Sequence, residues 1–261
     1  MPANYAHYRF GVELISKLPP EIQRTVNRFR QLFDMGLHGP DILNYHDPLI
    51  KTPTVRLCDK LHAQTGQVFF ERTCRVVRMN PSEGARAYLY GLLAHYCLDS
   101  LSAGRVIRIS EEKELSRGKI WGEFDRFLLE LDGKTPAHRF DMSAHVQLTP
   151  GECQTVALFY PNVGSSGIGR CVKRMASCIK LQSGAPRSRW QMLTGAADRL
   201  APRVAEIAVP TRPLHPLNKN NPELLRLYEL AQARYLHLLE QLRSHLRRKT
   251  PLGPDFSLPF R

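Results

Sequence analysis

The chain has 261 residues, 43% of them hydrophobic, and its 37 lysines and arginines outnumber its 24 aspartates and glutamates, which gives a formal net charge of +13. This hydrophobic fraction argues against a disordered chain, and the longest uncharged apolar run, near 89–94, is far shorter than the roughly 20 residues of a membrane-spanning helix. The positive charge favours anionic partners, such as nucleic acid, phospholipid head groups or phosphorylated metabolites, and is equally compatible with a basic surface that only aids solubility.

The first half of the chain shows apolar residues at helical spacing and no convincing strand alternation. They first recur at intervals of four, three and four, at Ile22, Val26, Phe29 and Phe33. This spacing predicts one amphipathic helix after the proline pair at 19–20, closed by Gly36. Three further helical stretches are predicted: 52–79, with Gly66 as the position where it would break, 83 to about 100, and about 120–131.

The second half gives weaker signals. Residues 134–148 are interpreted as a loop, and 149–152 (TPGE) as a capping box that begins a helix. Helices are expected at about 168–182 and 186–200. The glycine-rich stretch GSSGIG at 164–169 is interpreted as a flexible connector, because its spacing is not that of a dinucleotide-binding fingerprint. After a proline-rich segment, Asn221-Pro222-Glu223 begins a helix that reaches about Arg248.

These elements predict an all-α helical bundle, with residues 1–261 as a single domain in which the helices of 134–261 pack on those of 1–133. The cysteines lack C-x-x-C spacing, which favours reduced, buried thiols over a disulfide framework: Cys58, Cys74, Cys97, Cys153, Cys171 and Cys178. The N-terminal sequence MPANYAHYRF lacks the apolar segment of a secretory signal. A cytoplasmic location is therefore expected, although a secreted protein whose leader had been removed would look the same.

A histidine and an aspartate stand one helical turn apart in LLAHYCLDS. His95 and Asp99 project from one face of a helix, so both can reach a common ion. Such a pair alone indicates no more than a hydrogen bond between two side chains. Further candidates come from other segments: His7, Asp41 and His62. Imidazole nitrogens and carboxylate oxygens from separate helices are the ligands that a zinc site inside a helical bundle requires.

Five stretches surround these residues in order: MPANYAHYRFG, LFDMGLHGPDIL, LHAQTGQVFFER, GLLAHYCLDS and GEFDRFLLELDG. At these stretches the chain resembles the zinc-dependent phospholipase C family, which includes the bacterial enzymes of the cereus and alpha-toxin type, over roughly residues 1–133. The resemblance implies an all-helical fold, a zinc cluster in the core of the bundle, and hydrolysis of phosphodiesters such as phosphatidylcholine by a metal-activated water.

The resemblance also implies roles for the individual ligands. Asp41, His62, His95 and Asp99 correspond to the shell of a first zinc ion, and Asp99 to a bridge toward a second ion held by His7 and the N-terminal amine. Asp41 corresponds to the catalytic base near the attacking water. If all four residues bind one ion, its tetrahedron is full, as in a structural zinc site. Catalysis then requires one ligand to dissociate or the shell to expand.

The family's third metal pocket has no counterpart in this chain. Its three ligand positions fall on Ala103, Arg117 and Trp121, so one or two zinc ions are expected rather than three, with slower catalysis. Arg105 and Arg117 could contact the phosphate of a substrate in place of the missing cation, because a guanidinium presents forked donors to phosphate oxygens. The alternative is that these arginines lie on a solvated helix face.

The sequence thus predicts a divergent zinc-dependent phosphodiester hydrolase with a reduced metal centre, acting on an anionic ligand such as a phospholipid head group. Two other functions stay open. One is a non-catalytic module that keeps zinc for stability and binds phosphate or lipid, which the missing ligands favour. The other is a basic helical protein that binds nucleic acid, which only the charge supports. His38 and His46 flank Asp41 and either orient it or lie in a loop, and His145 lies outside the resemblance.

Overall fold

The computed structural model describes residues 4–47, 50–184 and 208–260. These residues form helices and turns, and they contain no strand beyond an isolated bridge between Thr65 and Pro259. The predicted all-α fold is therefore confirmed for this part of the chain. None of the helices in these ranges is long and apolar enough to cross a membrane. All six cysteines lie within the described residues and are thiols. The single-domain organisation of residues 1–261 stays a prediction.

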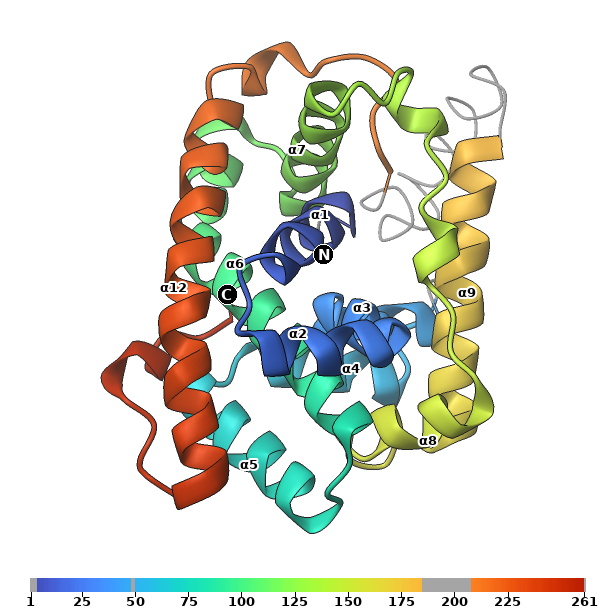
Figure 1. Cartoon of the computed structure of the whole chain (residues 1–261). Helices are drawn as coiled ribbons and strands as arrows, with labels where there is room; N and C mark the ends of the chain where they lie inside the picture. The colour runs from blue at the N-terminus through green and yellow to red at the C-terminus, as the bar shows by residue number, and fades with distance from the viewer. Residues whose placement is uncertain (1–3, 48–49, 185–207, 261) are drawn as a thin grey trace.

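Two long helices frame the molecule in Figure 1, α12 on one side and α9 on the other, with α1 and α6 between them. The α-helices are α1 (Asn4–Ile15), α2 (Pro20–Arg28), α3 (Arg30–Leu37), α4 (Pro53–His62), α5 (Gly66–Met79), α6 (Glu83–Lys113), α7 (Arg117–Leu131), α8 (Pro150–Ala157), α9 (Ser165–Gly184) and α12 (Asn221–Arg248). Short 3-10 helices, of which η1 (Gly39–His46) is the longest, connect them. Residues 87–99 of α6 are buried without interruption, because α3 and α12 both pack against this helix.

Local sequence signals set many helix ends as predicted. The side chain of Thr52 accepts a hydrogen bond from the Val55 amide at the start of α4, and Thr149 and Glu152 form a complete capping box at α8. The break expected near Gly66 separates α4 from α5, α7 ends before Asp132, and α12 begins at Asn221. These positions carry side-chain caps, proline or glycine, whose effects do not depend on the rest of the fold.

Three predicted elements are wrong in detail. The helix expected between Ile22 and Gly36 is split at Phe29, whose φ of −116° and ψ of 46° are not helical. The stretch GSSGIG belongs to α9 from Ser165 onward rather than to a connector, since buried Ile168 already lies on the apolar face of that helix. α6 continues past Ser100 to Lys113, because buried Val106 and Ile109 extend its apolar face. The helix predicted at 186–200 lies outside the described residues.

The break at Phe29 turns α3 against α6, and this crossing positions the site. A Cβ atom on Gly36 would lie 2.4 Å from the carbonyl oxygen of Tyr88, and one on Gly91 would lie 2.3 Å from the carbonyl oxygen of Phe33. Only glycine at both positions permits so close an approach of the two backbones. The end of α3 and the η1 segment that follows it are thereby held beside the middle of α6.

Candidate metal centre

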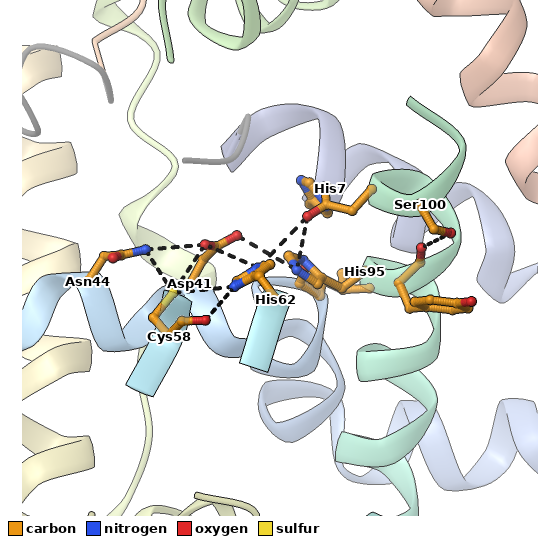
Figure 2. A network of polar contacts seen from close by, with 10 residues as sticks. His7, Asp41, Asn44, Cys58, His62, His95 and Ser100 are labelled. Carbon is orange, nitrogen blue, oxygen red and sulfur yellow. Dashed lines mark hydrogen bonds and ion pairs between the residues drawn. The ribbon is translucent and has the colours of Figure 1, made fainter. Parts of the chain in front are cut away.

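Three α-helices and a 3-10 segment bring the five predicted ligands to one buried place. The imidazole of His7 comes from α1 and that of His62 from the last residue of α4. Asp41 comes from η1, and α6 supplies His95 and Asp99 one turn apart. Each of the five is buried, with at most 7% of its surface exposed. Figure 2 shows Asp41, His62 and His95 pointing toward one another.

Four of these residues form what we call the His/Asp cluster: Asp41, His62, His95 and Asp99. One ligand atom from each lies within 4.8 Å of the others. The Nε2 atom of His95 is 3.4 Å from Oδ2 of Asp99 and 3.6 Å from Oδ2 of Asp41, and Nε2 of His62 is 3.5 Å from Oδ1 of Asp41. Ligand atoms around a tetrahedral zinc ion, with bonds of about 2.0–2.1 Å, lie about 3.3 Å apart. The spacing of the cluster is therefore close to that of a coordination shell.

His7 lies at the edge of this cluster and contacts it through Asp99. Its Nε2 atom is 3.1 Å from Oδ1 of Asp99, and its ring centre is 4.6 Å from that of His95. The two oxygens of Asp99 thus face different histidines, Oδ1 toward His7 and Oδ2 toward His95. A carboxylate in this arrangement has the two-sided geometry of a bridge between neighbouring ions.

Backbone carbonyls fix the orientation of two imidazole rings. Nδ1 of His62 donates to the carbonyl oxygen of Cys58 at 2.8 Å, and Nδ1 of His95 donates to that of Leu37 at 3.1 Å. A carbonyl only accepts, so Nδ1 carries the hydrogen, and in a neutral ring Nε2 presents its lone pair. Neither Nε2 atom has a hydrogen-bond partner. Metal-binding histidines show this same pattern, with the second nitrogen held by a carbonyl or carboxylate.

The charges around these rings favour a cation between them. Burial lowers the pKa of His95 to about 4, although Asp99 opposes the shift, so this ring is neutral at pH 7. Burial alone would raise the pKa of Asp41 and Asp99, but the neighbouring histidines, His62 for Asp41 and His95 for Asp99, hold both below their usual value. Burial likewise opposes the charging of His62, but Asp41 and Cys58 raise its pKa well above 6.5, so this ring must release its Nε2 proton before that nitrogen can bind a metal ion. Two ionised carboxylates therefore face the lone pair of His95, an arrangement that a divalent cation would complement.

Smaller contacts set the positions of the ligands. Gly39 has a φ of +53°, and a Cβ atom there would lie 2.5 Å from Cδ2 of His95, so only glycine lets η1 pass this ring. Asn44 donates to Oδ1 of Asp41 at 3.2 Å. Phe260 packs edge-on against His62, with ring centres 5.6 Å apart, and covers the cluster from that side.

Two arginines and a tryptophan at or near the predicted positions of the absent third metal pocket supply no ligand to the cluster. Arg105 pairs with Glu223 at 2.7 Å and Glu112 at 3.2 Å, and the side chain of Arg117 is exposed. No contact within the described residues joins either arginine to the cluster, so their role toward a substrate phosphate stays a prediction. The Trp121 ring lies 6.3 Å from the His7 ring, where it packs beside the metal-ligand candidates instead of supplying a ligand.

A pair of buried histidines next to the cluster was not predicted as a pair. Nε2 of His38 lies 2.9 Å from Nε2 of His145, and the His145 ring stacks on Tyr8 at 3.9 Å. Burial lowers the pKa of His145 to about 3 and holds that of His38 well below 6.5, so both rings are neutral at pH 7. His38 stands three residues before Asp41, and this short spacing indicated that it could lie near the site. His145 lies in a segment without helical periodicity, which gave no such indication. His46 instead contacts Thr52 at 3.3 Å.

No protein-family model matches this chain, and no curated protein or solved structure matches it. The observations therefore support an all-helical protein with a buried His/Asp cluster that could hold a metal ion, and they assign no family.

Proposed function

We propose that the His/Asp cluster binds a divalent metal ion, with zinc favoured by the donor set, and that the chain uses it to hydrolyse phosphodiesters. One observation carries the proposal. The unpartnered Nε2 atoms of His62 and His95 converge with the ionised oxygens of Asp41 and Asp99 at distances of 3.4–3.9 Å. Mixed imidazole and carboxylate donors suit zinc better than calcium or magnesium, which prefer oxygen alone.

Asp41, His62, His95 and Asp99 would hold the first ion, and Asp99 with His7 would hold a second. When bound, zinc polarises a phosphoryl oxygen and lowers the pKa of a bound water toward about 7. Asp41 is the base of this proposal, because its carboxylate is ionised and is positioned by Asn44. Asp99 keeps both sides of the centre together through its two oxygens.

The choice of a phosphodiester rests on two further features. The resemblance to zinc-dependent phospholipase C covers all five ligand-bearing positions in order, and the net charge of +13 attracts an anionic substrate such as a phospholipid. The third metal pocket has no ligands in this chain, so we expect turnover slower by orders of magnitude than a three-metal centre supports.

A second function is favoured by one specific observation. The cluster supplies four donors, and each of the four residues is at least 93% buried. A complete tetrahedral shell without an open position is the arrangement of structural zinc sites. In this case the metal stabilises the fold of a phosphate- or lipid-binding module without catalysing a reaction.

The test combines metal analysis with hydrolysis of bis(p-nitrophenyl) phosphate by the full chain. We expect the purified protein to bind one or two zinc ions per chain and to hydrolyse this diester. His95→Ala should lose most of the zinc and lower turnover at least about a hundredfold. The control is His215→Ala, since His215 is exposed and lies outside the cluster.

The outcomes separate the two functions. Zinc at 100 times its Kd should stabilise the wild-type protein against urea by about 2.7 kcal/mol in either case, and His95→Ala should lose this effect. Zinc binding with no turnover would support the structural role. A wild-type protein that binds no transition metal would contradict both.

A further inference from the structure

A cavity rich in arginine lies away from the His/Asp cluster, between α2, the end of α5, the start of α6 and the end of α12. Its volume is about 730 Å³, within the range of pockets that bind small molecules. Six arginines line it, and we call it the arginine cavity: Arg24, Arg28, Arg78, Arg86, Arg243 and Arg247. Figure 1 shows the elements that supply them around the lower half of α12.

The arginine cavity has an excess of positive charge. Only Glu21 and Glu83 among its lining residues carry a negative charge, which leaves six minus two, or four, positive charges. Glu21 pairs with Arg243 and lies 3.6 Å from Arg247, and Glu83 pairs with Arg28 at 3.1 Å. Glu240, which does not line the cavity, also pairs with Arg243 at 3.0 Å, so the local excess is three to four positive charges. The other three arginines have no carboxylate within ion-pair distance in the described ranges: Arg24, Arg78 and Arg86.

The arginines are crowded as well as numerous. Burial lowers the pKa of Arg243, and the neighbouring Arg247 lowers it further, which is the electrostatic cost of like charges held together. Arg78 is fixed in place, because its Nη1 donates to the carbonyl oxygen of His245 at 3.3 Å. Tyr90 also lines the cavity and is 7% exposed. Burial raises its pKa, so its phenol is a neutral hydrogen-bond donor at pH 7.

The arginine cavity is separate from the candidate metal centre. No residue of the His/Asp cluster lines it. Arg86 and His95 are nine residues apart on α6, which at about 1.5 Å per residue separates them by roughly 14 Å along the helix. A ligand in the cavity therefore needs no metal ion to be held.

We propose that the arginine cavity binds a small anion that carries at least two phosphate groups. Each phosphate monoester carries a charge of about −1.5 to −2 at pH 7, so two of them match an excess of three to four positive charges. Guanidinium groups bind phosphate oxygens through pairs of parallel hydrogen bonds. The three arginines without a carboxylate partner offer more such donors than one phosphate group needs, and the three paired with glutamates add to the positive field around the same space. The same chemistry is offered by a soluble polyphosphate and by the head group of a polyphosphorylated lipid.

The first experiment is calorimetric titration of the metal-free full chain with inorganic pyrophosphate and with orthophosphate. We expect pyrophosphate to bind at least about tenfold more tightly than orthophosphate. The double variant Arg78→Gln/Arg86→Gln should weaken pyrophosphate binding about a hundredfold, since each of the two charged hydrogen bonds contributes about a factor of ten. The matched control is Arg108→Gln/Arg226→Gln, which removes the same charge from positions outside the cavity and should bind as the wild type does.

Further variants distinguish this site from the proposed metal centre. His95→Ala should bind pyrophosphate as the wild type does, even if it fails to bind zinc. Loss of pyrophosphate binding in His95→Ala, with retention in Arg78→Gln/Arg86→Gln, would assign the anion to the His/Asp cluster and overturn the proposal. Equal weakening by the two arginine pairs would also overturn it, because it would show attraction by net charge alone. Thermal unfolding of each variant verifies that it folds.

The source of the phosphates is tested with vesicles. Phosphatidylcholine vesicles with and without phosphatidylinositol 4,5-bisphosphate are sedimented with the protein, and inositol 1,4,5-trisphosphate is added as a soluble competitor. Binding that requires the phosphorylated lipid and is displaced by the competitor supports a lipid head group, whereas binding of the soluble compound alone supports a free ligand. Tighter binding of a double-stranded oligonucleotide than of either compound would overturn the small-ligand proposal.

Discussion

The His/Asp cluster and the arginine cavity hold charged side chains in opposite ways. The cluster buries its groups almost completely, mixes acceptors from carboxylates and imidazoles, and brings one atom of each within 4.8 Å. The arginine cavity holds mostly positive side chains, six arginines against two glutamates, around a space of about 730 Å³ and leaves several of them exposed. Converging buried acceptors leave room for a small cation, whereas spread guanidinium groups leave room for a larger anion. The sign of the uncompensated charge at each place thus indicates whether it suits a cation or an anion.

The largest expected effect comes from closing the space beside the cluster. Gly39→Ala would place a Cβ atom 2.5 Å from the His95 ring at a φ of +53°, so η1 or the ring must move. We expect it to destabilise the protein by about 3 kcal/mol and to weaken zinc binding at least about tenfold, measured by urea unfolding and zinc titration.

A second glycine distinguishes the effect of backbone strain from the effect of contact with the His95 ring. Gly133 has a φ of +70°, and a Cβ atom added there would have no neighbour within 4 Å, so Gly133→Ala should cost only about 1 kcal/mol and leave zinc binding unchanged. Equal effects of the two substitutions on zinc affinity would show that the approach of η1 to His95 is not important.

An intermediate effect concerns a buried carboxylate outside the cluster. Burial raises the pKa of Asp34 to about 6, although the Arg30 guanidinium at 2.7 Å opposes the shift. The histidines around Asp41 instead lower the pKa of that carboxylate below its usual value. Because folded Asp34 binds protons more tightly than the unfolded chain does, its contribution to stability decreases as the pH rises from about 4 to 6. Between these pH values the wild type should lose about 2 kcal/mol more than Asp34→Asn in urea unfolding. Identical pH profiles would contradict the raised pKa.

The smallest expected effect is at the helix surface. Arg105 pairs with Glu112 and Glu223, each about half exposed, so Arg105→Gln should change stability by less than about 1 kcal/mol. With its guanidinium engaged by two carboxylates, we expect the KM for bis(p-nitrophenyl) phosphate to stay unchanged. A marked rise in KM would instead support the sequence-based prediction that Arg105 contacts a substrate phosphate.

Features that depend on a few neighbouring residues could be predicted from the sequence. Thr52 and the capping box at 149–152 act locally, and the spacing of His95 and Asp99 places both on one helix face. The break at Phe29 could not be predicted in this way, because it depends on the packing of α3 against α6. His7, Asp41 and His62 were candidate ligands by residue type alone, and the resemblance to a known family gave them their individual roles beside the pair.

Other features required the fold itself. His38 and His145 meet across 107 positions of the chain, with no repeat or spacing that links them. The arginines of the cavity come from four helices, and in the sequence they look like any other basic surface residues. The net charge predicted an anionic partner, but only the arrangement of those helices gathers the charge at one place.

The close crossing of α3 and α6 has a consequence for how the site can vary. Gly36 precedes Leu37, whose carbonyl oxygen holds the His95 ring, and Gly91 lies one turn before His95 on α6. The separation of the two helix axes is therefore transmitted directly to the direction of a ligand nitrogen. If the His/Asp cluster binds a metal ion as proposed, a substitution that spreads the axes by a fraction of an ångström would change metal affinity while every ligand kept its identity, so residues that never touch the ion would help to set its selectivity.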